Sequence, residues 1–142
     1  MAETLLHKWF EEVWNRRNGD AVHAMLAPDC VIHNLAADGQ DVAGPAGFLA
    51  FQQSFLDAFP DTEITVHETV EQDDLIAGRW TMRASHAGHG LGFAPTHRGV
   101  TIPGMGIARV KDGRIVEGWN IWDAAAIRDQ LGFVSTPPEI RP

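Results

Sequence analysis

The chain has 142 residues, a length that suits one folded domain with a hydrophobic core of its own. Its 44% apolar and 21% charged content exclude a disordered chain. The formal net charge of −8 disfavours nucleic acid and anionic membrane surfaces, because both repel a negatively charged protein. We therefore expect a single domain over residues 1–134 and an irregular, Pro-rich tail over residues 135–142, with neither nucleic acid nor membrane as partner.

Two absences narrow the chemistry further. Cys30 is the only cysteine, so no internal disulfide can form, and its strand-like surroundings predict a buried free thiol. Charged residues recur through the first 30 residues, which predicts neither a signal peptide nor a membrane-spanning helix. A cytoplasmic location fits both observations. The chain contains no Tyr, so a mechanism that needs a phenol is excluded.

Helices are predicted first at the N-terminal end. Apolar residues at helical spacing predict one helix from Leu5 that ends at Asn18-Gly19. Asp20 is expected to cap a second helix over residues 21–26, which Pro28 ends. The apolar positions of the first helix are Leu5, Leu6, Trp9, Phe10, Val13 and Trp14.

A strand and a third helix follow. Residues 30–35 alternate in polarity, with Val31, His33 and Leu35 on one face. Pro45 suits the first turn of the next helix, which Pro60 ends. One stripe of that helix carries Phe48, Phe51, Phe55 and Phe59. Four Phe side chains on one stripe require a large covering surface.

The rest of the chain alternates with strand periodicity. Strands are predicted over residues 64–70, 75–85, 100–110 and 114–122. Turns at Asp73-Asp74 and at residues 111–113 join them into two hairpins. A last helix over residues 124–131 is expected, with Asp123 as its N-cap and Gly132 beyond its end. Consecutive antiparallel strands with helices on one side indicate an α+β fold.

Four segments resemble one known family. They are AFPDTEITV (58–66), GRWTMRASHAG (78–88), PTHRGVTIPGMGIARVKDGRIVEGWNIWD (95–123) and IRDQLG (127–132). Together they resemble the SnoaL-like polyketide cyclases of the nuclear transport factor 2-like (cystatin-like) superfamily. The resemblance implies a cone in which helices pack on one face of a curved antiparallel sheet around an apolar pocket. It also implies a homodimer that forms by packing of sheet on sheet.

The resemblance assigns a chemical role to Asp123. In the family's cyclases an aspartate at this place is the acid/base of an intramolecular aldol ring closure that needs no metal or organic cofactor. The same Asp123 is predicted from spacing alone to be a helix N-cap, and the two roles are compatible. Those cyclases also use a His on the preceding strand, where this chain has Met105, Ile107 and Arg109.

Histidines supply the next candidates. His33 is either a core residue or a proton relay across the pocket from Asp123. His86, which matches the family's strand-end His, is expected to touch substrate at the pocket rim. A metal site at His86, His89 and His97 is not predicted, because their spacing matches no ligand motif.

The remaining substrate-binding candidates are mostly aromatic. Arg79 and Trp80 should point to opposite faces of their strand, and Trp80 is the better candidate for the core because a buried guanidinium is costly. Trp119 shares strand parity with Asp123 and could form a wall beside it. Each of these aromatic residues has core packing as its alternative role. The full set is Arg79, Trp80, His86, Met105, Trp119, Phe51, Phe55 and Phe59.

Three functions are compatible with the sequence. The first is a cofactor-independent enzyme that removes a proton next to a carbonyl of a small hydrophobic, polyketide-like molecule, in a cyclisation or an isomerisation. The second is a non-catalytic module for ligand binding or dimerisation. The third is an epoxide hydrolase, which ranks lower because no carboxylate stands two residues after Arg79. A carboxylate and a His converging on an open pocket would favour the first.

Overall fold

The computed structural model describes residues 3–36, 38–90 and 94–133, and the predicted tail at 135–142 lies outside these residues. The helices are α1 (Leu5–Trp9), the π-helical segment η1 (Phe10–Asn15), α2 (Gly19–Met25), α3 (Gly44–Ala58) and α4 (Ala124–Gln130). The strands are β1 (Leu26–His33), β2 (Val42–Ala43), β3 (Glu63–Gln72), β4 (Leu75–Ser85), β5 (Gly99–Lys111) and β6 (Arg114–Trp122).

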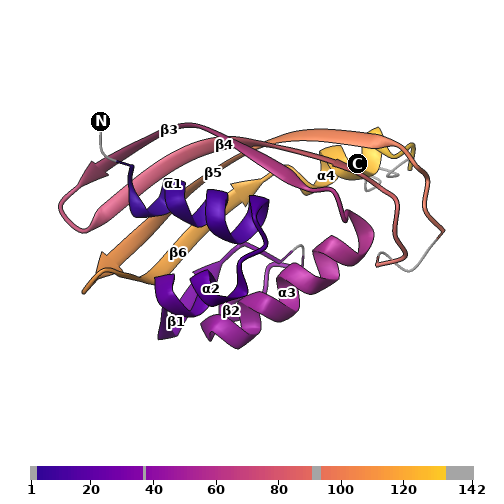
Figure 1. The fold of residues 1–142 in the computed structure, drawn as a ribbon. Coiled ribbons are helices and arrows are strands. Elements are labelled where there is room, and N and C mark those ends of the chain that lie inside the picture. The colour runs from indigo at the N-terminus through magenta and orange to yellow at the C-terminus, as the bar shows by residue number, and fades with distance from the viewer. Residues whose placement is uncertain (1–2, 37, 91–93, 134–142) are drawn as a thin grey trace, which may run out of the picture.

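The strands form one curved, mixed sheet in the order β2-β1-β6-β5-β4-β3 (Figure 1). The two predicted hairpins are confirmed as the antiparallel pairs β3–β4 and β5–β6. β1 adds to the far side of β6 in parallel, a pairing that needs the long connection through α3 and both hairpins. The predicted α+β fold is confirmed, with helices α1 to α3 gathered on one face of the sheet (Figure 1).

The N-terminal helix begins at Leu5, as the apolar spacing predicts, but it ends at Asn15 and not at Asn18-Gly19. Thr4 caps α1 by accepting a hydrogen bond from the His7 backbone N–H at 3.2 Å. The helix widens into η1, where the Arg16 N–H donates to the carbonyl of Glu11, five residues earlier. Its apolar side is buried, with Val13 only 1% exposed.

Two sequence-based boundaries were wrong around α2 and β1. Helix α2 begins at Gly19 because the side chain of Asn18, and not of Asp20, accepts from the first turn. Extended backbone resumes at Leu26, so the strand predicted over residues 30–35 covers Leu26–His33 instead. Pro28 lies inside this strand, where the pairing register with β6 is interrupted, because Pro has no N–H to donate.

Helix α3 follows the short strand β2, which the sequence had not predicted. Pro45 occupies its first turn as predicted. Phe48 is almost fully buried, and the Gln52 side-chain amide donates to the Val13 carbonyl at 2.9 Å, which ties α3 to η1. Within the described part of the chain, no helix is long and apolar enough to cross a membrane.

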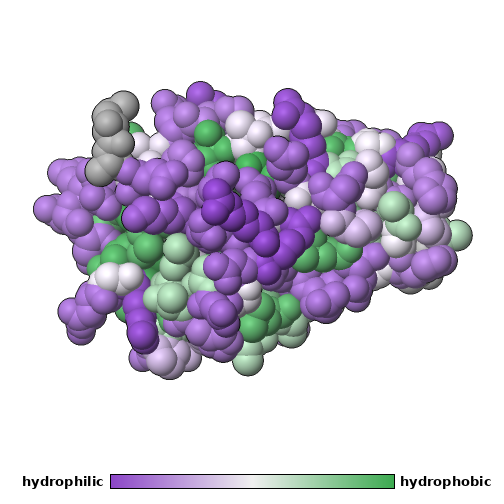
Figure 2. Space-filling view, viewed as in Figure 1, coloured by the Kyte–Doolittle hydropathy of each residue, from purple (hydrophilic) through white to green (hydrophobic). Residues whose placement is uncertain are grey.

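The two faces of the sheet differ in what covers them. The inner face, toward the helices, carries Trp80 and Met82 of β4 and Ile102 of β5, all buried. On the outer face several large apolar side chains remain exposed: Val70, Met105, Ile107 and Ile121. On the side of the molecule drawn in Figure 2, polar side chains divide the apolar surface over α2 and α3. The exposed large apolar residues of the described chain therefore belong to the outer face of the sheet.

Helix α4 closes one end of the sheet. The Gln130 side chain makes the two hydrogen bonds to β5 that a neighbouring strand would make. It accepts from the Thr101 N–H at 2.7 Å and donates to the Thr101 carbonyl at 2.9 Å. β6 pairs with β5 only as far as Gly104, so these backbone groups of Thr101 would otherwise face water. Asp123 is the N-cap of α4, as predicted.

Candidate functional site

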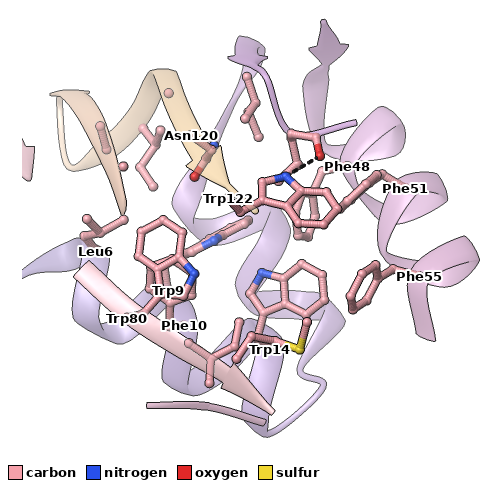
Figure 3. Close-up of a pocket in the computed structure, with 18 of the residues that line it drawn as sticks. Leu6, Trp9, Phe10, Trp14, Phe48, Phe51, Phe55, Trp80, Asn120 and Trp122 are labelled. Carbon is pink, nitrogen blue, oxygen red and sulfur yellow. Dashed lines mark hydrogen bonds between the residues drawn. The ribbon is translucent and has the colours of Figure 1, made fainter. Parts of the chain in front are cut away.

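An apolar pocket lies between the helices and the inner face of the sheet (Figure 3). Its cavity has a volume of about 90 Å³ and opens to solvent. Aromatic side chains from α1, η1, α3, β4 and β6 make much of its wall: Trp9, Phe10, Trp14, Phe48, Phe51, Phe55, Trp80 and Trp122. A cavity of about 150 Å³ holds benzene, so a ligand of the size of benzene or larger must extend into the mouth of this pocket or displace aromatic side chains.

Trp80 forms one wall because two glycines face it. Gly104 pairs with Trp80 in the β4–β5 ladder, and a Cβ atom at Gly104 would lie 2.5 Å from the Cε2 atom of the indole. A Cβ atom at Gly106 would lie 3.0 Å from the Cη2 atom of the same ring. Phe10 packs against the ring, with centroids 4.5 Å apart. The indole is therefore held between the strand backbone and the first helix.

Trp122 stands at the last position of β6 and lines the pocket. Its indole N–H donates to the Leu35 carbonyl at 2.9 Å (Figure 3). Its ring meets Phe55 edge-on, with centroids 6.2 Å apart. Trp122 thus connects the end of β6 to the segment after β1 and to α3.

Asp123 follows Trp122 directly and is exposed at the start of α4. Its Oδ1 atom accepts from the Ala126 N–H at 3.0 Å. In the described part of the chain no second hydrogen bond engages the carboxylate. Asp123 is not among the residues that line the pocket. The helix-capping role is thus observed, and the catalytic role stays a prediction.

His33 lies on the outer face of the sheet, not across the pocket from Asp123. Its Nδ1 atom is 2.9 Å from Asp41 Oδ1 and its Nε2 atom is 2.7 Å from Glu117 Oε2. Hydrogen bonds to these two carboxylates raise the pKa of His33, and the bond to Glu117 has the larger effect. We call His33, Asp41 and Glu117 the His33 cluster. His33 is not in the pocket, as one of its two predicted roles required, because Ile32 and not His33 points toward the inner face of β1.

Three other predicted site residues share this outer face. Trp119 pairs with His33 in the β1–β6 ladder, and the two rings stack at 5.6 Å. Arg79 points outward opposite Trp80, as strand parity requires, and its Nε atom donates to Glu68 Oε1 at 2.6 Å. Met105 is 61% exposed. The structure therefore separates these residues from the pocket, and Trp122 rather than Trp119 provides the Trp wall next to Asp123.

His86 is the first residue after β4; it is fully buried and does not line the pocket. Its Nδ1 atom accepts from the Thr96 N–H at 3.1 Å, and its ring contacts Phe59 with centroids 5.5 Å apart. Burial lowers the pKa of His86, and the charges of His97 and His89 lower it further. A neutral imidazole fits this site, because Nδ1 accepts a hydrogen bond.

The loop after His86 is docked against the end of α3. The N–H groups of Ala87 and Gly88 donate to the Ala58 carbonyl at 3.2 and 3.1 Å. A Cβ atom at Gly88 would overlap the Asp57 carbonyl oxygen. Among the residues that the structure describes, no group of three His, Cys, Asp or Glu side chains is arranged to hold a metal ion.

The predicted aromatic residues divide between pocket and core. Trp80, Phe51 and Phe55 line the pocket, whereas Phe59 is buried against His86 and does not. Their role in substrate binding stays a prediction. Sequence reasoning assigned no site role to the pocket residues Trp9, Trp14 and Asn120. Strand parity with Trp122 could have identified Asn120, since residues two apart share a face.

Comparison with known proteins gives a family and a fold. The family model described as SnoaL-like polyketide cyclase matches residues 4–131. IdmH from Streptomyces antibioticus, a proposed polyketide cyclase, has a TM-score of 0.78 and 31% sequence identity over 90% of this chain and 96% of its own. A comparison with curated proteins finds no match.

Two further solved structures share the architecture. AclR from Streptomyces galilaeus, a proposed hydroxylase, has a TM-score of 0.78 and 26% identity over 95% of this chain and 87% of its own. A proposed SnoaL-like polyketide cyclase from Jannaschia Sp. CCS1 has the same TM-score at 21% identity, over 89% of this chain and 88% of its own, and shows the fold alone.

Proposed function

Since this chain belongs to the SnoaL-like polyketide cyclase family, we propose that it is a cofactor-independent enzyme of cyclase type that acts on a hydrophobic, polyketide-like molecule in the aromatic pocket. The observation that carries the proposal is the pocket itself: an apolar cavity, open to solvent, at whose wall β6 ends in Trp122, with Asp123 as the next residue of the chain. Apolar clefts with few polar groups are the usual form of small-molecule sites.

The proposed chemistry is a proton transfer at Asp123. Its carboxylate takes a proton from a carbon next to a substrate carbonyl, and the resulting enolate attacks a second carbonyl of the same molecule. One new C–C bond forms, and the proton passes from Asp123 to the new alkoxide. The Ala126 N–H holds the Oδ1 atom, so Oδ2 is the oxygen proposed to receive the proton. Isomerisation would use the same first step and return the proton to another carbon.

A specific observation favours the non-catalytic module as the second candidate. Of the described residues that line the pocket, none carries a carboxylate or an imidazole. A pocket without a base can still bind a ligand. The epoxide hydrolase loses support, because Arg79 is paired with Glu68 on the outer face and does not line the pocket.

A ligand screen with a blocked control tests the proposal. Thermal shifts are measured for the wild type against polyketide-like, steroid-like and terpene-like compounds. In the control Gly118→Leu, a side chain grows from the pocket wall, where a Cβ atom would meet Ile32 at an ordinary 3.7 Å. We expect one class to stabilise the wild type and not the control. Equal stabilisation of both proteins would contradict binding in this pocket.

We also propose that two copies pair through the outer face of the sheet. Met105 lies opposite Ile121 in the β5–β6 ladder, and Ile107 lies opposite Trp119, so the apolar side chains form one continuous area. Met105 is 61% and Ile121 is 70% exposed in the single chain. Large exposed apolar areas on a soluble domain are typical of interfaces, and symmetric pairs of identical chains are the most common assembly.

A further inference from the structure

One amide lies in an otherwise apolar pocket. Apart from indole groups, the only polar side chains that line the described pocket are those of Thr62 and Asn120. The Thr62 hydroxyl donates to the Phe59 carbonyl at 2.7 Å, so its hydrogen already has a partner. In Figure 3 the Asn120 amide projects from β6 into the space ringed by the labelled aromatic side chains. Asn120 is therefore the polar group most available to a ligand.

The glycine opposite Asn120 in the sheet makes room for its side chain. Gly106 lies opposite it in the β5–β6 ladder, and a Cβ atom at Gly106 would lie 2.9 Å from Asn120 Oδ1. The same Cβ atom would lie 3.0 Å from the Trp80 ring. The missing side chain of Gly106 thus leaves room for both the amide and the indole.

No described residue is within hydrogen-bonding geometry of the Asn120 side chain. Both of its ends therefore depend on water in the free protein. An apolar ligand that fills the pocket would remove this water and leave the amide without a partner, which costs free energy. A ligand with a correctly placed oxygen would restore the hydrogen bond. Sites built in this way reject analogues that lack the polar group.

We propose that Asn120 is the specificity-determining residue of the pocket, and that it selects hydrophobic molecules with a hydroxyl or carbonyl oxygen over the equivalent hydrocarbon. The inference rests on the proposed binding of ligands in the pocket and is independent of a catalytic role for Asp123. Asn120 lies three residues before Asp123, about 10 Å along an extended chain. The selected oxygen is thus distinct from the carbonyl that would react near Asp123.

Two probes of nearly equal shape test the inference: 2-naphthol and naphthalene, which differ by one oxygen. Their affinities are measured by isothermal titration calorimetry for the wild type, Asn120→Leu and Thr62→Val. We expect the wild type to bind 2-naphthol roughly tenfold more tightly, the size of effect that one unpaired buried polar group gives. Asn120→Leu should reduce this preference to about twofold or less, while Thr62→Val should retain it.

Each outcome separates the two proposals. Equal affinity of the wild type for the two probes would overturn the role of Asn120 and leave the pocket as a binding site. A tenfold preference for 2-naphthol that persists in Asn120→Leu would also overturn the role of Asn120 and leave the pocket as a binding site. If neither probe binds the wild type, the proposed ligand pocket fails, and the role of Asn120 fails with it. The wild-type comparison needs no variant, so a poorly folded Asn120→Leu protein does not prevent a decision.

Discussion

The substitution Gly104→Ala tests how the pocket wall is built. Gly104 is buried in β5, directly opposite Trp80 in the ladder. An added methyl group would lie 2.5 Å from the indole Cε2 atom and 2.8 Å from Cζ2, well inside contact distance. Phe10 packs against the ring with centroids 4.5 Å apart, which limits how far the indole can move away from the added methyl group. The substitution must move either the indole or the strand.

The expected cost follows from overpacking. Adding a methyl group to a filled core typically costs about 1–3 kcal/mol. For 142 residues, an unfolding entropy of about 2.1 cal/mol/K per residue gives about 0.3 kcal/mol per degree. The melting temperature should therefore fall by about 3–10 °C. Gly99→Ala is the matched control in the same strand, because its nearest atom would be 3.9 Å away.

The assay is thermal unfolding followed by near-ultraviolet circular dichroism, which also reports on the Trp80 environment. We expect Gly99→Ala to melt at or slightly above the wild-type temperature, since Ala loses less backbone entropy than Gly on folding. Gly104→Ala should melt lower and show an altered aromatic signal. If Gly104→Ala melts at or above the wild type with an unchanged signal, Trp80 does not lie across this glycine and the reasoning is refuted.

Three further predictions concern the rest of the molecule. The pKa of His33 is raised, so the His33 cluster stabilises the fold fully below the usual pKa of 6.5 and loses this effect as the pH rises through the raised value. In urea titrations, His33→Gln should therefore reduce the free energy of unfolding by up to about 1 kcal/mol near pH 6 and by less near pH 9. A loss that does not depend on pH would contradict this. Replacing Met105 and Ile121 together by Glu should convert the proposed dimer to a species of 15.6 kDa in light scattering, and a wild type that already has this mass at micromolar concentration would refute the dimer. Gln130→Ala removes both hydrogen bonds to Thr101 and should lower stability by about 1–3 kcal/mol, whereas an unchanged denaturation midpoint would show that water replaces them at no cost.

Local patterns predicted most of the fold. Apolar spacing located the N-terminal helix, and the turn at Asp112-Gly113, where both residues have positive φ, fixed the second hairpin. The parallel pairing of β1 with β6 was not predictable, because no periodicity records which distant strand lies beside which. The boundary between α2 and β1 was missed for a different reason: Pro28 can end a helix but can also lie at an irregular point of a strand.

The site was harder to predict than the fold. Strand parity correctly turned Trp80 inward and Arg79 outward. The same rule applied to Asp123 gave Trp119 as its wall, but Asp123 lies beyond the end of β6, where alternation no longer applies. His33 was ambiguous because a half-polar strand carries no sign of which face is covered. Only the packing of α1, η1 and α3 shows that Ile32 faces the pocket.

The most direct test of the account is deuterium exchange at carbon. The probe 6-hydroxy-1-tetralone has a phenolic oxygen for Asn120 at one end and, at the other, acidic protons next to a ketone that can approach Asp123. Incorporation of deuterium at these positions in D2O is followed by NMR for the wild type, Asp123→Asn and the blocked control Gly118→Leu. We predict exchange above the buffer rate in the wild type and exchange at the buffer rate in the control Gly118→Leu. In Asp123→Asn we predict that the exchange rate falls by roughly a hundredfold or more, while the melting temperature falls by no more than about 4 °C. Exchange at the wild-type rate in a folded Asp123→Asn protein would contradict the proposed base, and absence of exchange in the wild type despite binding would favour the non-catalytic module.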